Sequence, residues 1–118
     1  MAVAKKHKRK LVFKDREFFW YVRDEDDGGL ALTVLSGDKR FAVQYALEQA
    51  AQTRHIVVMN EEFGVGHHRT GCYRRYLCPD WDRDGAVTPG VVRELIEWCQ
   101  DPPTNLVEVD WLGRPVER

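Results

Sequence analysis

The chain has 118 residues and a net charge of −1, with 43% hydrophobic and 31% charged residues. This length supports one hydrophobic core rather than two, and the composition is that of a folded protein. No stretch is apolar and long enough for a membrane-spanning helix, and the basic N-terminus lacks the apolar segment of a secretory signal. Three cysteines without a disulfide-scaffold spacing fit a reducing compartment. We therefore expect a cytoplasmic protein.

Charge is distributed unevenly along the chain. The first ten residues hold five cations and no acid, so the remaining residues are net acidic. This predicts a flexible basic arm over residues 1–10 and a single domain over residues 11–118. Such an arm can neutralise nucleic-acid phosphates, although it could equally be a solubilising terminus, and the acidic body would repel phosphates. The cations of the arm are Lys5, Lys6, Lys8, Arg9 and Lys10.

Several stretches have the alternating or β-branched pattern of strands. They are residues 11–13, 17–23, 30–35, 54–59 and 73–77. The stretch 17–23 carries aromatic residues on both faces, which predicts a central strand, although the exposed rings could also mark a homodimer contact. One face holds Phe18, Trp20 and Val22, and the other holds Phe19 and Tyr21. The acidic, glycine-containing residues 24–29 are expected to form a loop.

Residues 38–52 allow two interpretations. A hairpin at residues 36–39 can lead into an antiparallel strand over 40–47, followed by a short helical turn. Alternatively, one helix spans 38–52, because Val43, Leu47 and Ala50 share a helical face. We favour the strand.

The clearest local pattern is a helix that begins after Thr88. Thr88 can cap it, Pro89 suits the first helical position, and Pro102 ends it after Asp101. Its apolar face consists of Val92, Leu95, Ile96 and Cys99. A short strand can follow within residues 106–112. The fold class expected is α+β, with an antiparallel sheet of four to six strands packed against this C-terminal amphipathic helix.

A second basic group lies close to histidine and tyrosine residues. Arg69, Arg74 and Arg75 could bind anions while the aromatic rings stack on a ligand. The alternative, which we favour, is that they are solvent-facing residues of an exposed strand. In that strand we expect Arg74 and Tyr76 to point outward and Arg75 to lie on the opposite side.

The segment 67–78 contains residue types that bind zinc or act as nucleophile and base. The candidates are His67, His68, Cys72 and Cys78. Paired short Cys-x2-Cys knuckles are missing, so we expect no cofactor and keep zinc as an alternative. The glycines of residues 64–71 lack the pattern of a phosphate-binding loop, and the acidic residues 80–85 lack the last ligand of a calcium loop.

Taken together, these patterns predict a small non-enzymatic binding module whose partner is a protein or, through the basic arm, nucleic acid. A zinc-stabilised binding domain that uses residues 67–78 is one alternative. A small enzyme that depends on a cysteine and a histidine is the other.

Overall fold

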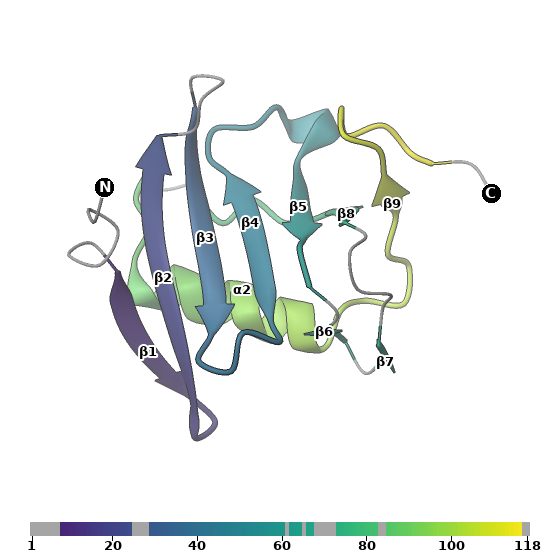
Figure 1. Ribbon diagram of the computed structural model, residues 1–118. Coiled ribbons are helices and arrows are strands. Elements are labelled where there is room, and N and C mark those ends of the chain that lie inside the picture. Colours follow the sequence, from purple (N-terminus) through teal and green to yellow (C-terminus); the bar gives the residue numbers. More distant parts are fainter. Residues whose placement is uncertain are drawn as a thin grey trace.

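The described part of the chain folds into a seven-stranded antiparallel sheet, and one α-helix packs against one face of it (Figure 1). The computed structural model describes residues 8–24, 29–60, 62–64, 66–67, 73–82 and 85–116. The strand order is β1-β2-β3-β4-β5-β8-β9, and the short β6–β7 hairpin comes between β5 and β8 in the chain. The α+β class expected from the sequence is confirmed, with seven strands in the sheet. No described helix is long and apolar enough to cross a membrane.

The elements follow the expected order closely. Their bounds are β1 Arg9–Phe13, β2 Arg16–Asp24, β3 Leu30–Ser36, β4 Ala42–Ala46, the 3-10 turn η1 Ala51–Thr53, β5 His55–Val58, β6 Glu62–Phe63, β7 Gly66–His67, β8 Arg74–Leu77, α2 Pro89–Gln100 and β9 Glu108–Val109. Residues 38–52 form the strand and short turn, and the single-helix interpretation is wrong. The first strand begins at Arg9, within the segment expected as an arm, because Arg9 and Lys10 pair with Trp20 and Phe19.

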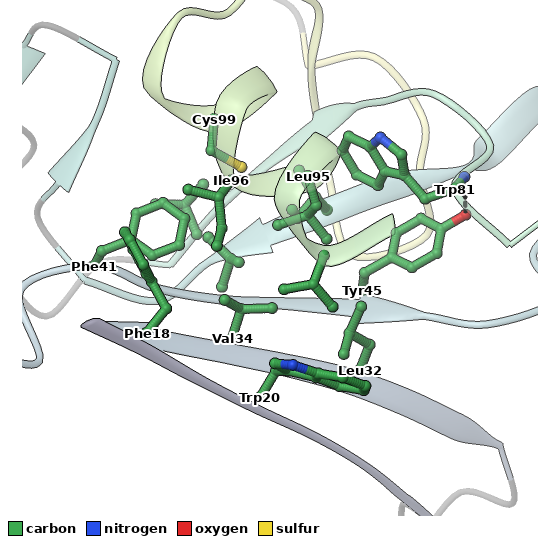
Figure 2. Packing of buried hydrophobic residues seen from close by; sticks show 14 of the residues in the cluster. Phe18, Trp20, Leu32, Val34, Phe41, Tyr45, Trp81, Leu95, Ile96 and Cys99 are labelled. Carbon is green, nitrogen blue, oxygen red and sulfur yellow. Dashed lines mark hydrogen bonds between the residues drawn. The ribbon is translucent and has the colours of Figure 1, made fainter. Parts of the chain in front are cut away.

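The core lies between the sheet and α2. The register puts Phe18 and Trp20 of β2 on the same face as Val34 of β3 and Tyr45 of β4. Figure 2 shows these side chains turned toward Leu95 and other residues of the helix. The expected apolar face of α2 is fully buried against them. Burial of each large apolar side chain contributes about 1.5–3 kcal/mol to the free energy of folding. The interface between the sheet and α2 is therefore the main source of hydrophobic stabilisation.

Both predicted ends of α2 are confirmed. The Thr88 side chain accepts a hydrogen bond from the Val91 amide at 3.2 Å, and Pro89 is the first helical residue. The Asp101 amide donates to the Glu97 carbonyl at 3.1 Å, and the helix ends before Pro102. These contacts fix where the helix lies on the sheet.

Aromatic rings extend the core beyond the C-terminal half of α2. Phe63 stacks on Tyr76 with ring centroids 4.8 Å apart, and Trp81 lies edge-on to both Tyr45 and Trp98. Tyr76 is therefore buried on the helix side, and the expectation that it points outward is wrong. The described residues 78–82 of the acidic loop form no helix or strand, as expected, and the Trp81 ring anchors them in the core.

Candidate functional site

The face of the sheet opposite α2 is not covered by any described helix or strand. In Figure 1 the helix crosses behind β2, β3 and β4, and the other face is turned toward the viewer. We call this surface the open face. Strand alternation and register assign to it Lys10 and Val12 of β1, Glu17, Phe19, Tyr21 and Arg23 of β2, Ala31, Thr33 and Leu35 of β3, Ala42, Gln44 and Ala46 of β4, His55 and Val57 of β5, Arg75 and Leu77 of β8, and Val109 of β9.

Over β2 and β3 the open face is aromatic and apolar. Phe19, Tyr21 and Leu35 are half-buried there. Thr33 is only 4% exposed, because its strand neighbours, including its direct partner Tyr21, shield it. The rings of Phe19 and Tyr21 therefore lie next to the smaller, buried Thr33 and keep part of their surface exposed. We call Phe19, Tyr21 and Leu35 the platform.

Cations surround this platform. The Lys8 ammonium lies 5.9 Å from the centroid of the Tyr21 ring, and the Arg23 guanidinium lies 5.6 Å from it. Both distances are within the range of cation–π attraction, so two cations lie close to the Tyr21 ring. Lys10 forms an ion pair with Glu17 at 3.0 Å. The negative charge of Glu17 on this face is thereby balanced.

A hollow of about 340 Å³ lies on the open face beside the β3–β4 turn. We call it the Phe19 hollow. Phe19 and Leu35, which are direct partners across β2 and β3, provide its apolar wall. Its remaining lining consists of Lys8, Ser36, Gly37 and Lys39. The described lining therefore combines apolar surface with two cations, and the Glu17 carboxylate beside Gly37 is paired with Lys10.

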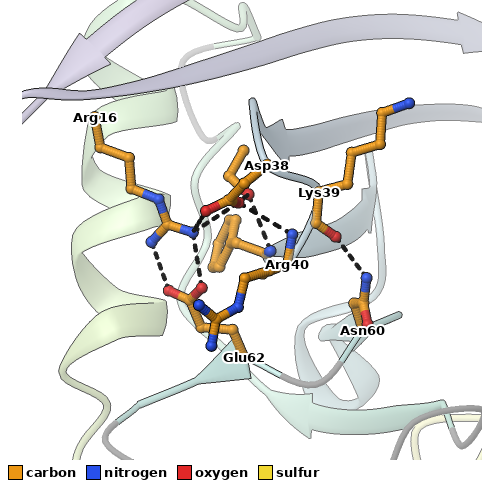
Figure 3. A network of polar contacts seen from close by, with 8 residues as sticks. Arg16, Asp38, Lys39, Arg40, Asn60 and Glu62 are labelled. Atoms are coloured by element: carbon orange, nitrogen blue, oxygen red, sulfur yellow. Dashed lines mark hydrogen bonds and ion pairs between the residues drawn. The ribbon is translucent and has the colours of Figure 1, made fainter.

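A polar cluster holds the turn that borders this hollow (Figure 3). Arg16 binds both carboxylate oxygens of Glu62, at 2.7 and 2.8 Å, and also binds Asp38 at 3.1 Å. Asp38 accepts hydrogen bonds from the Ser36 hydroxyl and the Arg40 amide, which lowers the pKa of its carboxyl to about 2, with Arg16 adding to the effect. The turn is thereby tied to β2 and β6.

Alternation divides both of the predicted basic groups. Lys8, Lys10 and Arg75 belong to the open face. Arg9 instead lies 5.6 Å from the Trp20 ring, and Arg74 lies 3.4 Å from the Tyr76 hydroxyl, on the helix side. Three further candidates, Lys5, Lys6 and Arg69, lie outside the described residues.

Of the proposed metal or catalytic residues, only Cys78 has a described side chain. His68 and Cys72 lie outside the described residues, and His67 is described only as part of β7. Burial raises the pKa of the Cys78 thiol to about 12, so the described thiol is protonated at neutral pH. Within the described ranges, no three His, Cys, Asp or Glu side chains are grouped to hold a metal ion. Cys99 is fully buried in the core.

The platform and its hollow are formed by Phe19, Tyr21, Leu35 and Lys39. The sequence marked Phe19 and Tyr21 only as rings of a central strand or of a homodimer contact, and it did not single out Leu35 or Lys39. The available signal was the presence of aromatic residues on both faces of the stretch 17–23. One set became core, and the other is the ring surface of the open face.

Comparison of the chain with protein-family models, curated proteins and solved structures gives no match.

Proposed function

We propose that this chain is a non-enzymatic binding module that holds single-stranded nucleic acid across the open face of its sheet. The observation that carries the proposal is the pair of accessible rings, Phe19 and Tyr21, with cations around them on a face that no described element covers. Nonspecific binding of single strands requires these two features together, namely rings for the bases and cations for the phosphates.

The balance of cations and acids favours the open face over the helix side near Trp98. The open face and the edge of its hollow carry more cations than acids, with Glu17 paired to Lys10. On the helix side, a shallow hollow beside Trp98 is lined by Glu94, Glu97 and Asp101. A polyanion is repelled there and attracted to the open face, although the whole chain has a net charge near zero.

The mechanism of binding follows from the spacing of these groups. Bases stack on the rings in a sequence-tolerant way, because every base has a π-face. Phosphates between the bases meet Lys8 and, farther along the sheet, Arg75, which releases counterions. The predicted arm residues Lys5 and Lys6 add affinity in the same way. We place this activity in the cytoplasm, in keeping with the cysteine pattern.

The first prediction concerns the salt dependence of binding. Fluorescence anisotropy with a labelled oligothymidylate should give an affinity that falls steeply as salt rises. Replacing Lys8 by Gln should lower the slope of log K against log salt by about 0.7, the value for one lost phosphate contact on a single strand. Arg75→Gln should have a similar effect, since Arg75 lies on the same face.

Arg93→Gln is the matched control, because Arg93 is an exposed cation of α2 on the opposite side of the molecule. Its salt slope should equal that of the wild type. Absence of binding at low salt contradicts the proposal, as does an equal loss of slope in the Arg93 and Lys8 variants. If oligothymidylate does not bind, a protein is the partner that the prediction of a binding module leaves for the open face.

A further inference from the structure

We infer that the Phe19 hollow seats one unstacked nucleobase of the bound strand, with Lys8 and Lys39 contacting the phosphates on its two sides. This inference rests on the proposed function, and it adds one defined position for a base to the general stacking of bases on the rings of the open face.

The lining of the hollow suits a flat ring system. Its volume of about 340 Å³ is at the lower end of the range for pockets that hold small molecules. Phe19 and Leu35 offer adjacent apolar surface from two paired strands. A base that leaves its stack loses contact area, and an aromatic wall of this kind restores it.

The charges at the hollow select an anionic occupant. Lys8 directly precedes β1, and Lys39 lies in the β3–β4 turn. Two segments that are far apart in the sequence therefore each bring a cation to the hollow. Figure 3 shows the Lys39 side chain directed away from the Arg16, Asp38 and Glu62 cluster, which leaves its ammonium outside that network. A strand supplies the required arrangement, a neutral ring with a phosphate on each side.

The turn that borders the hollow is fixed before any ligand arrives. The Gly37 amide donates to the Glu17 carbonyl and the Lys39 amide donates to the Ser36 carbonyl, both at 2.9 Å. Asp38 binds Arg16 as well as the Ser36 hydroxyl. Because these bonds already order the turn, little conformational entropy is lost when a base enters.

Gly37 gives a way to fill the hollow without removing a core side chain. Its φ angle is not positive, and an added Cβ would lie 3.7 Å from the nearest atoms of Glu17, an ordinary contact. Gly37→Leu therefore places a side chain at the hollow. Gly29→Leu is the matched control, because Gly29 precedes the other end of β3 and an added Cβ there meets nothing within 4 Å.

The experiment compares two labelled probes of equal length and charge by anisotropy. One is oligothymidylate, and the other is the same sugar–phosphate backbone without bases. The wild type should bind the base-bearing strand about tenfold more tightly than the abasic one. Gly37→Leu should lose most of that preference while still binding the abasic strand, and Gly29→Leu should keep it. Lys39→Gln should weaken the binding of both probes.

The outcomes separate this inference from the proposed function. Equal, salt-sensitive binding of both probes by the wild type overturns the base seat and also the stacking of bases on the rings, so that only the attraction of the cations for phosphates is left. Failure to bind either probe overturns the proposed function as a whole. A preference that is unchanged in Gly37→Leu, with circular dichroism showing the variant folded, overturns the seat alone and leaves the proposed function in place. Displacement of oligothymidylate by equimolar thymidine monophosphate would also overturn the inference, because a free nucleotide would then be the ligand of the hollow.

Discussion

Asp38 connects two functions of the β3–β4 turn, because it holds the turn in place and lies next to the residues that border the Phe19 hollow. Its carboxylate contacts Arg16, the Ser36 hydroxyl and the Arg40 amide. Ser36 in turn accepts a hydrogen bond from the Phe41 amide at 3.0 Å, which leads into β4. One exposed acid thus organises a buried hydroxyl and two strands.

The lowered pKa of Asp38 predicts how its contribution to stability depends on pH. The pKa falls from 3.8 to about 2 on folding, so the unfolded chain takes up the proton first as the solution is acidified. The stabilisation is complete above about pH 4 and decreases as the pH falls toward 2. Urea unfolding of the wild type and of Asp38→Asn should therefore differ in midpoint near neutral pH.

That difference in midpoint should shrink when the same pair is compared at about pH 3. Asp24→Asn serves as the control, because Asp24 is an exposed carboxylate at the end of β2, away from the β3–β4 turn. A difference between wild type and Asp38→Asn that stays constant across this pH range would contradict the account of the turn.

At the scale of single residues, the sequence predicts burial better than it predicts contacts between distant residues. Alternation alone separates Phe18 from Phe19 and Lys8 from Arg9. It does not show that Tyr76 finds Phe63 as a stacking partner, and this contact is the reason why the outward assignment of Tyr76 failed. Nor does it reveal the bond between Arg16 and Glu62, which are 46 residues apart.

At the scale of elements, β2 is the strand that organises the fold. It pairs along its length with β1 and β3, with Phe18 and Trp20 toward the helix and Phe19 and Tyr21 toward the open face. Its two aromatic faces serve two purposes, since one set of rings closes the core and the other forms the proposed binding platform.

The helix α2 gives a prediction about local stability. Thr88→Ala removes the side-chain cap of the Val91 amide and should lower the free energy of unfolding by about 1 kcal/mol. Gly90→Ala should raise it by about 0.4–1 kcal/mol, because alanine restricts the unfolded chain and its Cβ has room beside Thr88. Urea denaturation measures both changes.

Neither helix variant should change the affinity for oligothymidylate, because both sites lie away from the open face. If Thr88→Ala left the stability unchanged, the cap would contribute nothing to the helix. If it weakened binding while the protein remained fully folded, the assignment of the binding surface would be wrong.

Element by element, local signals were sufficient wherever one pattern dominated. The helix boundaries followed from Thr88, Pro89 and Pro102. Residues 38–52 were ambiguous because their C-terminal part favours a helix, and the buried alternation of Phe41, Val43 and Tyr45 decided for a strand. The strand β9 has only two residues because the chain turns at Asp110 into a short segment that returns to pair at Pro115.

At the scale of the whole molecule, the open face carries more cations than acids, although Arg9, Arg74 and Arg93 lie on the helix side. The sequence suggests a basic arm followed by an acidic body, and β1 already includes Arg9 and Lys10. The described acids near Trp98 lie on the helix side, whereas Lys8, Lys39 and Arg75 border or belong to the open face. The body can therefore attract a polyanion on one side while its net charge stays near zero.

The binding surface could be predicted only in part. The sequence identified the basic residues as candidates, but it does not show which face of the sheet the helix covers. The position of the helix decides which of the basic residues lie near aromatic rings on the open face. The open face is a consequence of sheet order and of the placement of α2, both of which depend on contacts between segments far apart in the chain.

The central claim is that single-stranded nucleic acid binds the open face, with its bases over β1 to β3 and its backbone reaching Arg75 of β8. It is tested most directly by two-dimensional amide and methyl NMR spectra of the full chain during titration with oligothymidylate. We expect the largest shifts at amides of β1, β2 and β3 and at the methyl groups of Leu35, with little change along α2. Shifts concentrated on α2, or spectra that do not change at low salt, would contradict the account.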